Sequence, residues 1–154
     1  MRLFPKAPLA ISSLRWHGGP SSPADAPTVP INYFLPNSTE DGGERVTVPA
    51  RVGESLMKIA HRHHIPIEGA CEGVCACSTC HVILSENLYD SLAESPETEA
   101  SEDEEDMLDM APGLTPTSRL GCQVFVTEGM AEIEVEVPAM TRNFYVDGHV
   151  PEPH

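Results

Sequence analysis

The stretch Gly69-Ala-Cys71-Glu-Gly-Val-Cys-Ala-Cys77-Ser-Thr-Cys80 holds four of the five cysteines of the chain and no aromatic residue. Five residues separate Cys71 from Cys77, and two separate Cys77 from Cys80. The remaining cysteine, Cys122, follows Cys80 after 41 intervening residues. Because the stretch is rich in small residues, we predict an irregular loop whose backbone can closely approach a bound group, with the distant thiol folding back to it.

Three thiols on one loop and a fourth elsewhere predict a cofactor site. Thiolates are soft ligands that suit iron, and four of them can supply two ligands to each iron of a two-iron cluster. Backbone N–H groups beside small residues can turn toward the cluster sulfur atoms, where they stabilise the negative charge that reduction adds. We therefore expect a [2Fe–2S] cluster held by Cys71, Cys77, Cys80 and Cys122.

Other interpretations of these residues stay open. A disulfide set is disfavoured by the odd number of cysteines and their tight spacing. A structural zinc site usually shows two separate Cys-x-x-Cys knuckles, whereas this chain has one. A Rieske centre needs two histidine ligands, and His81 directly follows Cys80, so we expect His81 to make a structural hydrogen bond instead.

Cys75 is expected to be a dispensable packing residue. A solvated helix end, not a metal site, is expected for His61, His63 and His64.

The loop from Glu68 to His81 resembles the cluster loop of the vertebrate-type, adrenodoxin-like ferredoxins, whose five-residue first gap differs from the four-residue gap of plant-type ferredoxins. The segment Asp106-Met-Leu-Asp-Met-Ala is similar to the acidic interaction helix of that family, and Ser118-Arg-Leu-Gly-Cys-Gln to its fourth-ligand motif. Residues 141–154 resemble the tail of the branch that serves iron–sulfur assembly. The resemblance implies a β-grasp-type ferredoxin fold with a bound [2Fe–2S] cluster.

The same resemblance implies a function. We expect a one-electron carrier, not an enzyme, that receives electrons from NADPH through an FAD-containing ferredoxin reductase. The implied acceptor is the cysteine desulfurase–scaffold complex of mitochondrial iron–sulfur cluster assembly. Two alternatives stay open: donation to mitochondrial haem-thiolate monooxygenases, and, in a different class, a zinc-stabilised interaction domain.

Charge is unevenly distributed along the chain. Residues 1–24 contain Arg2, Lys6 and Arg15 and no acidic residue, so they carry +3 of a net charge of −15, which leaves −18 for the remainder. A basic, acid-free leader that contains serine is typical of a mitochondrial transit peptide. We therefore expect residues 1–28 to be a transit peptide and linker, and the protein to reside in the mitochondrial matrix. A basic tail without a targeting role is the alternative.

The acidic remainder limits the classes of partner. Its excess negative charge repels nucleic acid and anionic membrane surfaces and attracts basic protein surfaces. No stretch approaches the roughly 18 uninterrupted apolar residues that a membrane span requires. We therefore predict neither nucleic-acid binding nor membrane insertion.

Apolar periodicity predicts an α+β domain over residues 29–138, followed by a C-terminal tail at 139–154. Alternation at Ile31, Tyr33 and Leu35, and again at Val46 and Val48, predicts a β-hairpin. The other expected elements are a short helix at 55–60, a buried strand at 81–84, a helix at 101–111 that places Met107, Leu108, Met110 and Ala111 on one face, a strand at Val124 and Val126, and an edge strand at 133–137. This order suits a mixed sheet with a crossing helix and a separate acidic helix.

The helix expected at 101–111 is crowded with carboxylates. Like charges at i, i+3 and i+4 destabilise an isolated helix by roughly a few tenths of a kcal/mol per pair. We therefore expect these carboxylates to serve a function that outweighs this cost. We interpret them as a docking surface that steers Lys and Arg patches of redox partners, with a merely solvated face as the alternative. The expected docking residues are Asp106 and Asp109, followed by Asp103 and Glu104.

Overall fold

The computed structural model describes residues 27–36, 42–131 and 133–139. The predicted leader at 1–28 lies outside these residues except for its last two positions, and the predicted tail at 139–154 lies outside them except for its first. Eight elements form the described part of the chain: β1 (Thr28–Leu35), β2 (Glu44–Arg51), α1 (Leu56–Arg62), β3 (His81–Leu84), α2 (Glu86–Ala93), α3 (Glu102–Leu108), β4 (Ser118–Leu120) and β5 (Ile133–Glu136).

The predicted hairpin is confirmed. β1 and β2 pair antiparallel, with Ile31 opposite Val48 and Tyr33 opposite Val46. Ile31 and Tyr33 are fully buried, as their alternation with polar neighbours requires when one face of a sheet covers the core. The Tyr33 hydroxyl donates a 2.8 Å hydrogen bond to the carbonyl of Leu56, which ties the start of α1 to the sheet.

The five strands form one mixed sheet in the order β2-β1-β5-β3-β4. β5 therefore lies at the centre, parallel to β1 and antiparallel to β3, and the prediction of an edge strand at 133–137 is wrong. Ile133 and Val135 are buried while Glu134 is exposed, which shows that alternation reports one solvated face and not a free edge. On that solvated face Arg45 of β2 contacts Glu134 at 2.7 Å.

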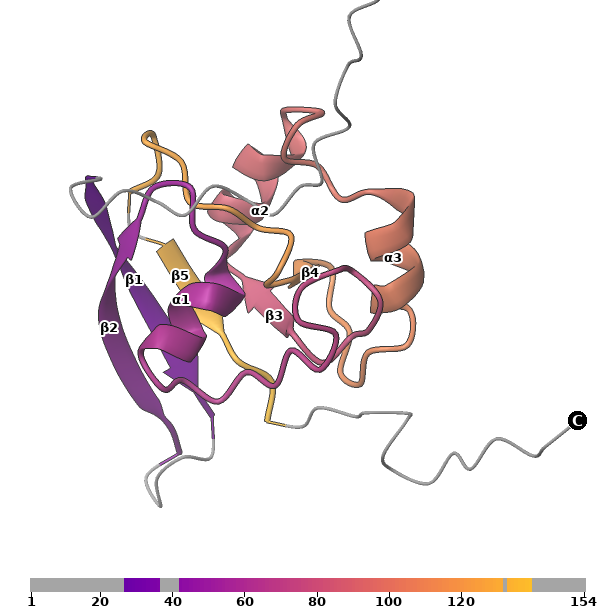
Figure 1. Ribbon diagram of the computed structural model, residues 1–154, viewed down its shortest axis with the longest axis horizontal. Helices are drawn as coiled ribbons and strands as arrows, with labels where there is room; N and C mark the ends of the chain where they lie inside the picture. The colour runs from indigo at the N-terminus through magenta and orange to yellow at the C-terminus, as the bar shows by residue number, and fades with distance from the viewer. Residues whose placement is uncertain (1–26, 37–41, 132, 140–154) are drawn as a thin grey trace, which may run out of the picture.

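α1 lies across the sheet as the crossing helix (Figure 1). The side chain of Ser55 caps its N-terminus by accepting a hydrogen bond from the backbone N–H of Lys58. The buried side of the helix carries Leu56, Met57, Ile59 and Ala60. None of the helices in the described residues is long and apolar enough to cross a membrane.

Two helices differ from the sequence prediction. No helix is predicted between Leu84 and Ser101, yet α2 forms there. Leu88 and Leu92 are four residues apart, so they lie on the same side of this helix, and both are buried in the hydrophobic core. α3 ends at Leu108, so Met110 lies beyond the helix and is exposed instead of sharing its apolar face.

The strand predicted at Val124 and Val126 is not formed. Both side chains are buried, but they belong to an irregular segment whose one isolated bridge in the described residues pairs Phe125 with Ser55, the N-cap of α1. Its backbone is paired with the approach to α1, since the Leu56 N–H donates to Val124 and the Val126 N–H donates to Glu54. The strand on this side of the sheet is β4, which ends at Leu120, two residues before Cys122.

Candidate iron–sulfur site

The loop at 69–80, hereafter the cluster loop, turns repeatedly between α1 and β3. Four of its residues have positive φ: Gly69 at 63°, Glu72 at 57°, Gly73 at 89° and Cys75 at 57°. Left-handed backbone is expected for glycine and uncommon for the other two residues. The Glu72 N–H donates to the Gly69 carbonyl at 2.9 Å, which closes the first turn. The predicted irregular loop is therefore confirmed.

The cluster loop packs against α1. Met57 is buried, and a Cβ atom added at Gly69 would lie 2.6 Å from its Sδ, while one added at Gly73 would lie 3.2 Å from its Cε. One helical turn on, His61 Nε2 lies 2.7 Å from the carbonyl of Ile67, just before the loop begins. The glycines thus allow the loop to lie directly on the face of α1 that carries Met57 and His61.

The four thiols selected from their spacing come together in two pairs. Cys71 and Cys77 share a side-chain hydrogen bond at the outer part of the loop. Cys80, at the start of β3, shares one with Cys122, which follows β4. The antiparallel pairing of His81 with Leu120 brings Cys80 and Cys122 together, and the Gly121 N–H donates to the Cys80 carbonyl at 2.8 Å.

Hydrogen-bond donors surround the buried pair and favour a thiolate. Hydrogen bonds from the thiol of Cys80, the side-chain amide of Gln123 and the N–H of Cys75 outweigh burial and lower the pKa of Cys122 to about 6. Gln123 Nε2 lies 3.2 Å from Cys122 Sγ. The pKa of Cys80 is correspondingly raised, because the Cys80 thiol donates and is itself buried. Thiolate is the form that ligates a metal.

Hydrogen-bond donors also favour the thiolate form of Cys71 in the outer pair. Burial raises the pKa of Cys71, but the backbone N–H of Ala76, the thiol of Cys77 and the N–H groups of Gly73 and Val74 outweigh it, so the pKa lies below its ordinary value. Thr79 Oγ1 lies 3.2 Å from Cys77 Sγ and accepts a hydrogen bond from the Ala70 N–H, which fixes both ends of the loop.

The donor set fits an iron–sulfur cluster. Backbone N–H groups point at sulfur atoms that carry negative charge, which is the environment that stabilises such a cluster. Two pairs of thiols match the two irons of a [2Fe–2S] cluster, each of which takes two protein ligands. Cys71 with Cys77 would hold one iron, and Cys80 with Cys122 the other.

Cys75 stands apart from both pairs. Burial, together with the negative charges of Cys122, Glu104, Asp103 and Cys71, raises its pKa to about 11. Its backbone N–H nevertheless contributes by donating to Cys122.

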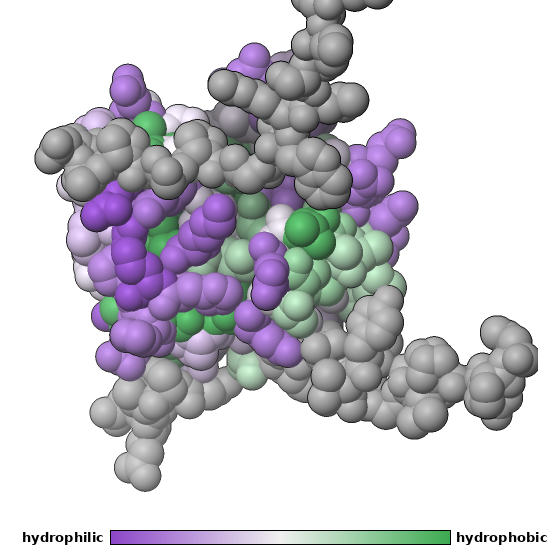
Figure 2. Space-filling model, viewed as in Figure 1, coloured by the Kyte–Doolittle hydropathy of each residue, from purple (hydrophilic) through white to green (hydrophobic). Residues whose placement is uncertain are grey.

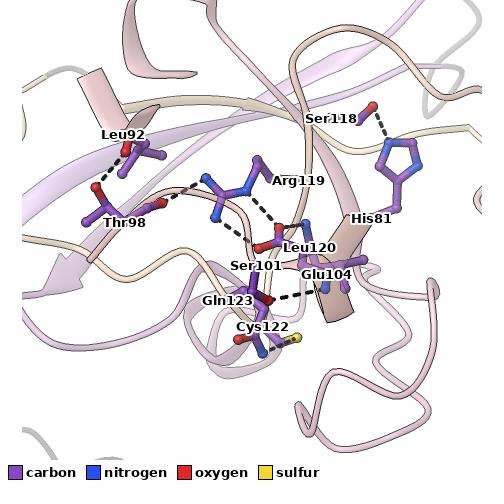
Figure 3. A network of polar contacts seen from close by, with 10 residues as sticks. All are labelled: His81, Leu92, Thr98, Ser101, Glu104, Ser118, Arg119, Leu120, Cys122 and Gln123. Carbon is purple, nitrogen blue, oxygen red and sulfur yellow. Dashed lines mark hydrogen bonds and ion pairs between the residues drawn. The ribbon is translucent and has the colours of Figure 1, made fainter. Parts of the chain in front are cut away.

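The acidic helix divides into an exposed and a buried set. Asp103, Asp106 and Asp109 are exposed, as a docking surface requires. Glu104 is only 1% exposed, so its assignment to the docking surface is wrong. Its carboxylate pairs instead with Arg119, with 2.7 Å between Oε1 and Nε and 3.0 Å between Oε2 and Nη2 (Figure 3).

This pair connects α3 to the cluster ligands. Glu104 Oε1 also accepts the Leu120 N–H at 2.8 Å, two residues before Cys122, and Arg119 Nη1 donates to the Thr98 carbonyl at 3.0 Å. Sequence reasoning missed the pair, although one signal was present. Glu104 is four residues before the buried Leu108 and so shares its helix face.

His81 makes the predicted structural hydrogen bond. Its Nε2 lies 2.7 Å from Ser118 Oγ, which also accepts the Thr115 N–H at 2.9 Å (Figure 3). Burial lowers the pKa of His81, and the backbone of Pro112 opposes this only partly, so the imidazole is neutral at physiological pH. His81 therefore fixes the loop after α3 to β3 without adding charge beside the thiols.

Comparison with known proteins agrees with this geometry. Residues 39–127 match the 2Fe-2S iron-sulfur cluster binding domain family. Over 112 residues the chain is 55% identical to ferredoxin-2, mitochondrial, of Danio rerio and 49% identical to adrenodoxin-like protein 1, mitochondrial, of Drosophila melanogaster. Each alignment covers 73% of this chain, and 55% and 62% of the respective relative, so the chain spans little more than half the length of these relatives.

Solved structures show the same fold. The ISC-like [2Fe-2S] ferredoxin of Pseudomonas putida is 41% identical, with a TM-score of 0.60 over 75% of this chain and 96% of its own. Putidaredoxin, in a covalent complex with putidaredoxin reductase, is 35% identical, with a TM-score of 0.59 over 73% of this chain and 99% of its own. The predicted α+β, β-grasp-type fold is thus confirmed, and the chain belongs to the [2Fe–2S] ferredoxin family, of the mitochondrial, adrenodoxin-like type.

Proposed function

We propose that the protein is a one-electron carrier that takes electrons from an FAD-containing ferredoxin reductase and donates them to mitochondrial iron–sulfur cluster assembly. A bound [2Fe–2S] cluster supplies a site that gains and loses a single electron. The observation that carries the proposal is the pairing of Cys71 with Cys77 and of Cys80 with Cys122, each among N–H, thiol or amide donors. These donors favour negative charge on sulfur, which ligation and reduction both require.

The exposed carboxylates of α3 support a carrier function. The helix itself lies beside the cluster loop (Figure 1), and residues 25–154 carry a large excess of negative charge. Charge of one sign near the site raises the association rate with basic partners and leaves dissociation fast at physiological salt, as a shuttle between two partners needs. Putidaredoxin, a relative of the same fold, forms a complex with its reductase, which supports a reductase as the electron donor.

The choice of acceptor rests on resemblance. The tail at 141–154 resembles that of the assembly branch, and a structural relative is described as ISC-like. Electron donation to the cysteine desulfurase–scaffold complex is accordingly the favoured role, ahead of haem-thiolate monooxygenases. The mitochondrial names of the relatives and the basic leader at 1–28 support a location in the matrix.

The decisive experiment combines composition with reduction. Purified protein should contain two irons and two acid-labile sulfides per chain and show the visible absorption of a [2Fe–2S] cluster. NADPH with a mitochondrial FAD-containing ferredoxin reductase should bleach that absorption. The reduced protein should then support sulfide release by a desulfurase–scaffold mixture and fail to support a mitochondrial haem-thiolate monooxygenase. Colourless protein that contains zinc would contradict the proposal and favour an interaction domain.

A further inference from the structure

A side chain as well as the backbone donates to the buried thiol pair. Gln123 is the only glutamine of the chain and directly follows Cys122. Its Nε2 lies 3.2 Å from Cys122 Sγ, and Figure 3 shows the amide turned back toward the sulfur. Cys122 is 3% exposed, whereas Gln123 is only half-buried. The amide thus reaches from a partly exposed position to a residue that solvent hardly contacts.

The turn that carries Cys122 does not depend on this amide. The backbone N–H of Gln123 donates to the Leu120 carbonyl at 2.9 Å, and the Gly121 N–H donates to the Cys80 carbonyl at 2.8 Å. These backbone bonds form whatever side chain stands at position 123. Ordering a glutamine side chain costs roughly 1.5–2 kcal/mol of conformational entropy. The benefit of the contact therefore lies at the sulfur and not in the fold.

The charge on the sulfur decides how strong this contact is. A neutral thiol is a weak hydrogen-bond acceptor. A hydrogen bond to an ionised acceptor is roughly twice as strong as one between neutral groups. The sulfur atoms around a cluster carry negative charge, which increases when the cluster gains an electron. The amide of Gln123 therefore stabilises the reduced form of the site more than the oxidised form.

Gln123 shares the Cys122 sulfur with a backbone donor. The Cys75 N–H also donates to Cys122, and its direction is fixed by the cluster loop, where Cys75 has φ of 57°. Figure 2 shows a mostly green, apolar surface where this loop faces the viewer. In apolar surroundings a hydrogen bond is electrostatically stronger than in water. Of these two N–H donors, only the amide of Gln123 can be removed without altering the backbone.

We infer that the side-chain amide of Gln123 raises the reduction potential of the cluster and is not needed to hold it. This inference rests on the proposed one-electron function of the same site. Hydrogen bonds to the sulfur atoms are among the features that set the potential of a cluster. Gln123 acts through Cys122, so it is a positioning residue and not a ligand.

The test compares Q123M with the parent protein, both loaded with the cluster. Methionine has nearly the length of glutamine and no donor. Redox titration followed by visible absorption should give a lower midpoint potential for Q123M. At the midpoint of the parent protein, we expect its ratio of reduced to oxidised cluster to fall about tenfold, which corresponds to about 59 mV for one electron. Iron per chain and Tm should match the parent protein.

Two control variants separate the amide from other causes. Asn87→Leu removes an exposed side-chain amide from α2 and should leave the potential unchanged. D106N removes an exposed negative charge from α3, so any effect on the potential should shrink at high salt. The effect of Q123M arises from direct contact with a buried sulfur and should persist at high salt.

An unchanged potential in Q123M with full iron content would overturn the inference and leave the proposed function standing. So would a decrease that disappears at high salt, because the amide would then act as a distant dipole. If Q123M lost iron, Q123A would be measured in the same way, and loss of iron from both variants would overturn the inference, since the amide would then be needed to hold the cluster. A cluster-loaded parent protein that took up no electron reversibly would instead contradict the proposed function.

Discussion

The carboxylate of Glu104 and the guanidinium of Arg119 form a two-point ion pair in which both side chains are almost fully buried. Breaking a buried pair from one side leaves an uncompensated charge, which costs about 3–5 kcal/mol. We expect Arg119→Met to lower the free energy of unfolding by about that amount, whereas Asp106→Asn, on the exposed face of the same helix, should change it by less than about 0.5 kcal/mol. Denaturant unfolding measures both. Equal values would show that the pair contributes no more than a surface charge.

Cysteine substitution tests the ligand assignment. We expect Cys71→Ser, Cys77→Ser, Cys80→Ser and Cys122→Ser each to lose the cluster, because each removes one thiolate of a pair. Cys75→Ser should keep it, since the backbone N–H of residue 75, and not its thiol, contacts Cys122. Iron per chain and visible absorption decide the outcome. Loss of iron in Cys75→Ser together with retention in Cys71→Ser would require a different ligand set.

Asp106 and Asp109 test the docking function of α3. Both are exposed, and neither contacts a thiol in the described residues. Replacing both with Asn should leave the spectrum unchanged, weaken reductase-dependent reduction by about tenfold at low salt, and flatten its dependence on ionic strength. Reduction rates equal to those of the parent protein at low salt would indicate that the carboxylates only increase solubility. Replacing Glu44 of β2 and Glu97, both exposed, with Gln is the matched control for a loss of two negative charges elsewhere.

Gly69 tests the contact between α1 and the cluster loop. A Cβ atom would lie 2.6 Å from Met57 Sδ, and the residue has φ of 63°, so Gly69→Ala meets both a clash and backbone strain. We expect faster loss of iron to a chelator and a stability loss of about 1–3 kcal/mol. Gly129→Ala, where the added atom meets nothing within 4 Å, should be close to neutral. Partial rescue of Gly69→Ala by Met57→Ala would identify the clash as the cause.

Glu54 gives a pH-dependent prediction. Burial raises its pKa, but the hydrogen bond from Arg62, the N–H of Arg51 and the charges of both arginines lower it more, so the folded-state pKa lies below 4.5. A lowered carboxyl pKa stabilises the fold above the unfolded-state value, and the contribution is lost as pH falls through the folded-state value. The difference in unfolding free energy between the parent protein and Glu54→Gln should therefore be constant above about pH 5.5 and shrink toward pH 3. A difference that does not vary between pH 7 and pH 3 would contradict it.

Much of the site could be predicted because ligand spacing is a local property of the chain. Cys71, Cys77 and Cys80 lie within ten residues, and small residues between them already indicate a loop that wraps a cofactor. The distant Cys122 was selected as the remaining cysteine and by the resemblance of Ser118-Arg-Leu-Gly-Cys-Gln to a fourth-ligand motif. The hairpin, α1 and β3 were likewise predictable, since their burial follows the period of the apolar residues.

The sequence by itself determined the family, the four candidate thiols, the acidic character of one helix and the alternation of the strands, because each depends on residue type and short-range spacing. Only the tertiary structure decided that β5 is central, since alternation reports which side of a strand is solvated and not how many neighbours it has. It also decided that Glu104 is turned inward, because the partner that neutralises it, Arg119, is fifteen residues away and reaches it only when α3 lies against β4.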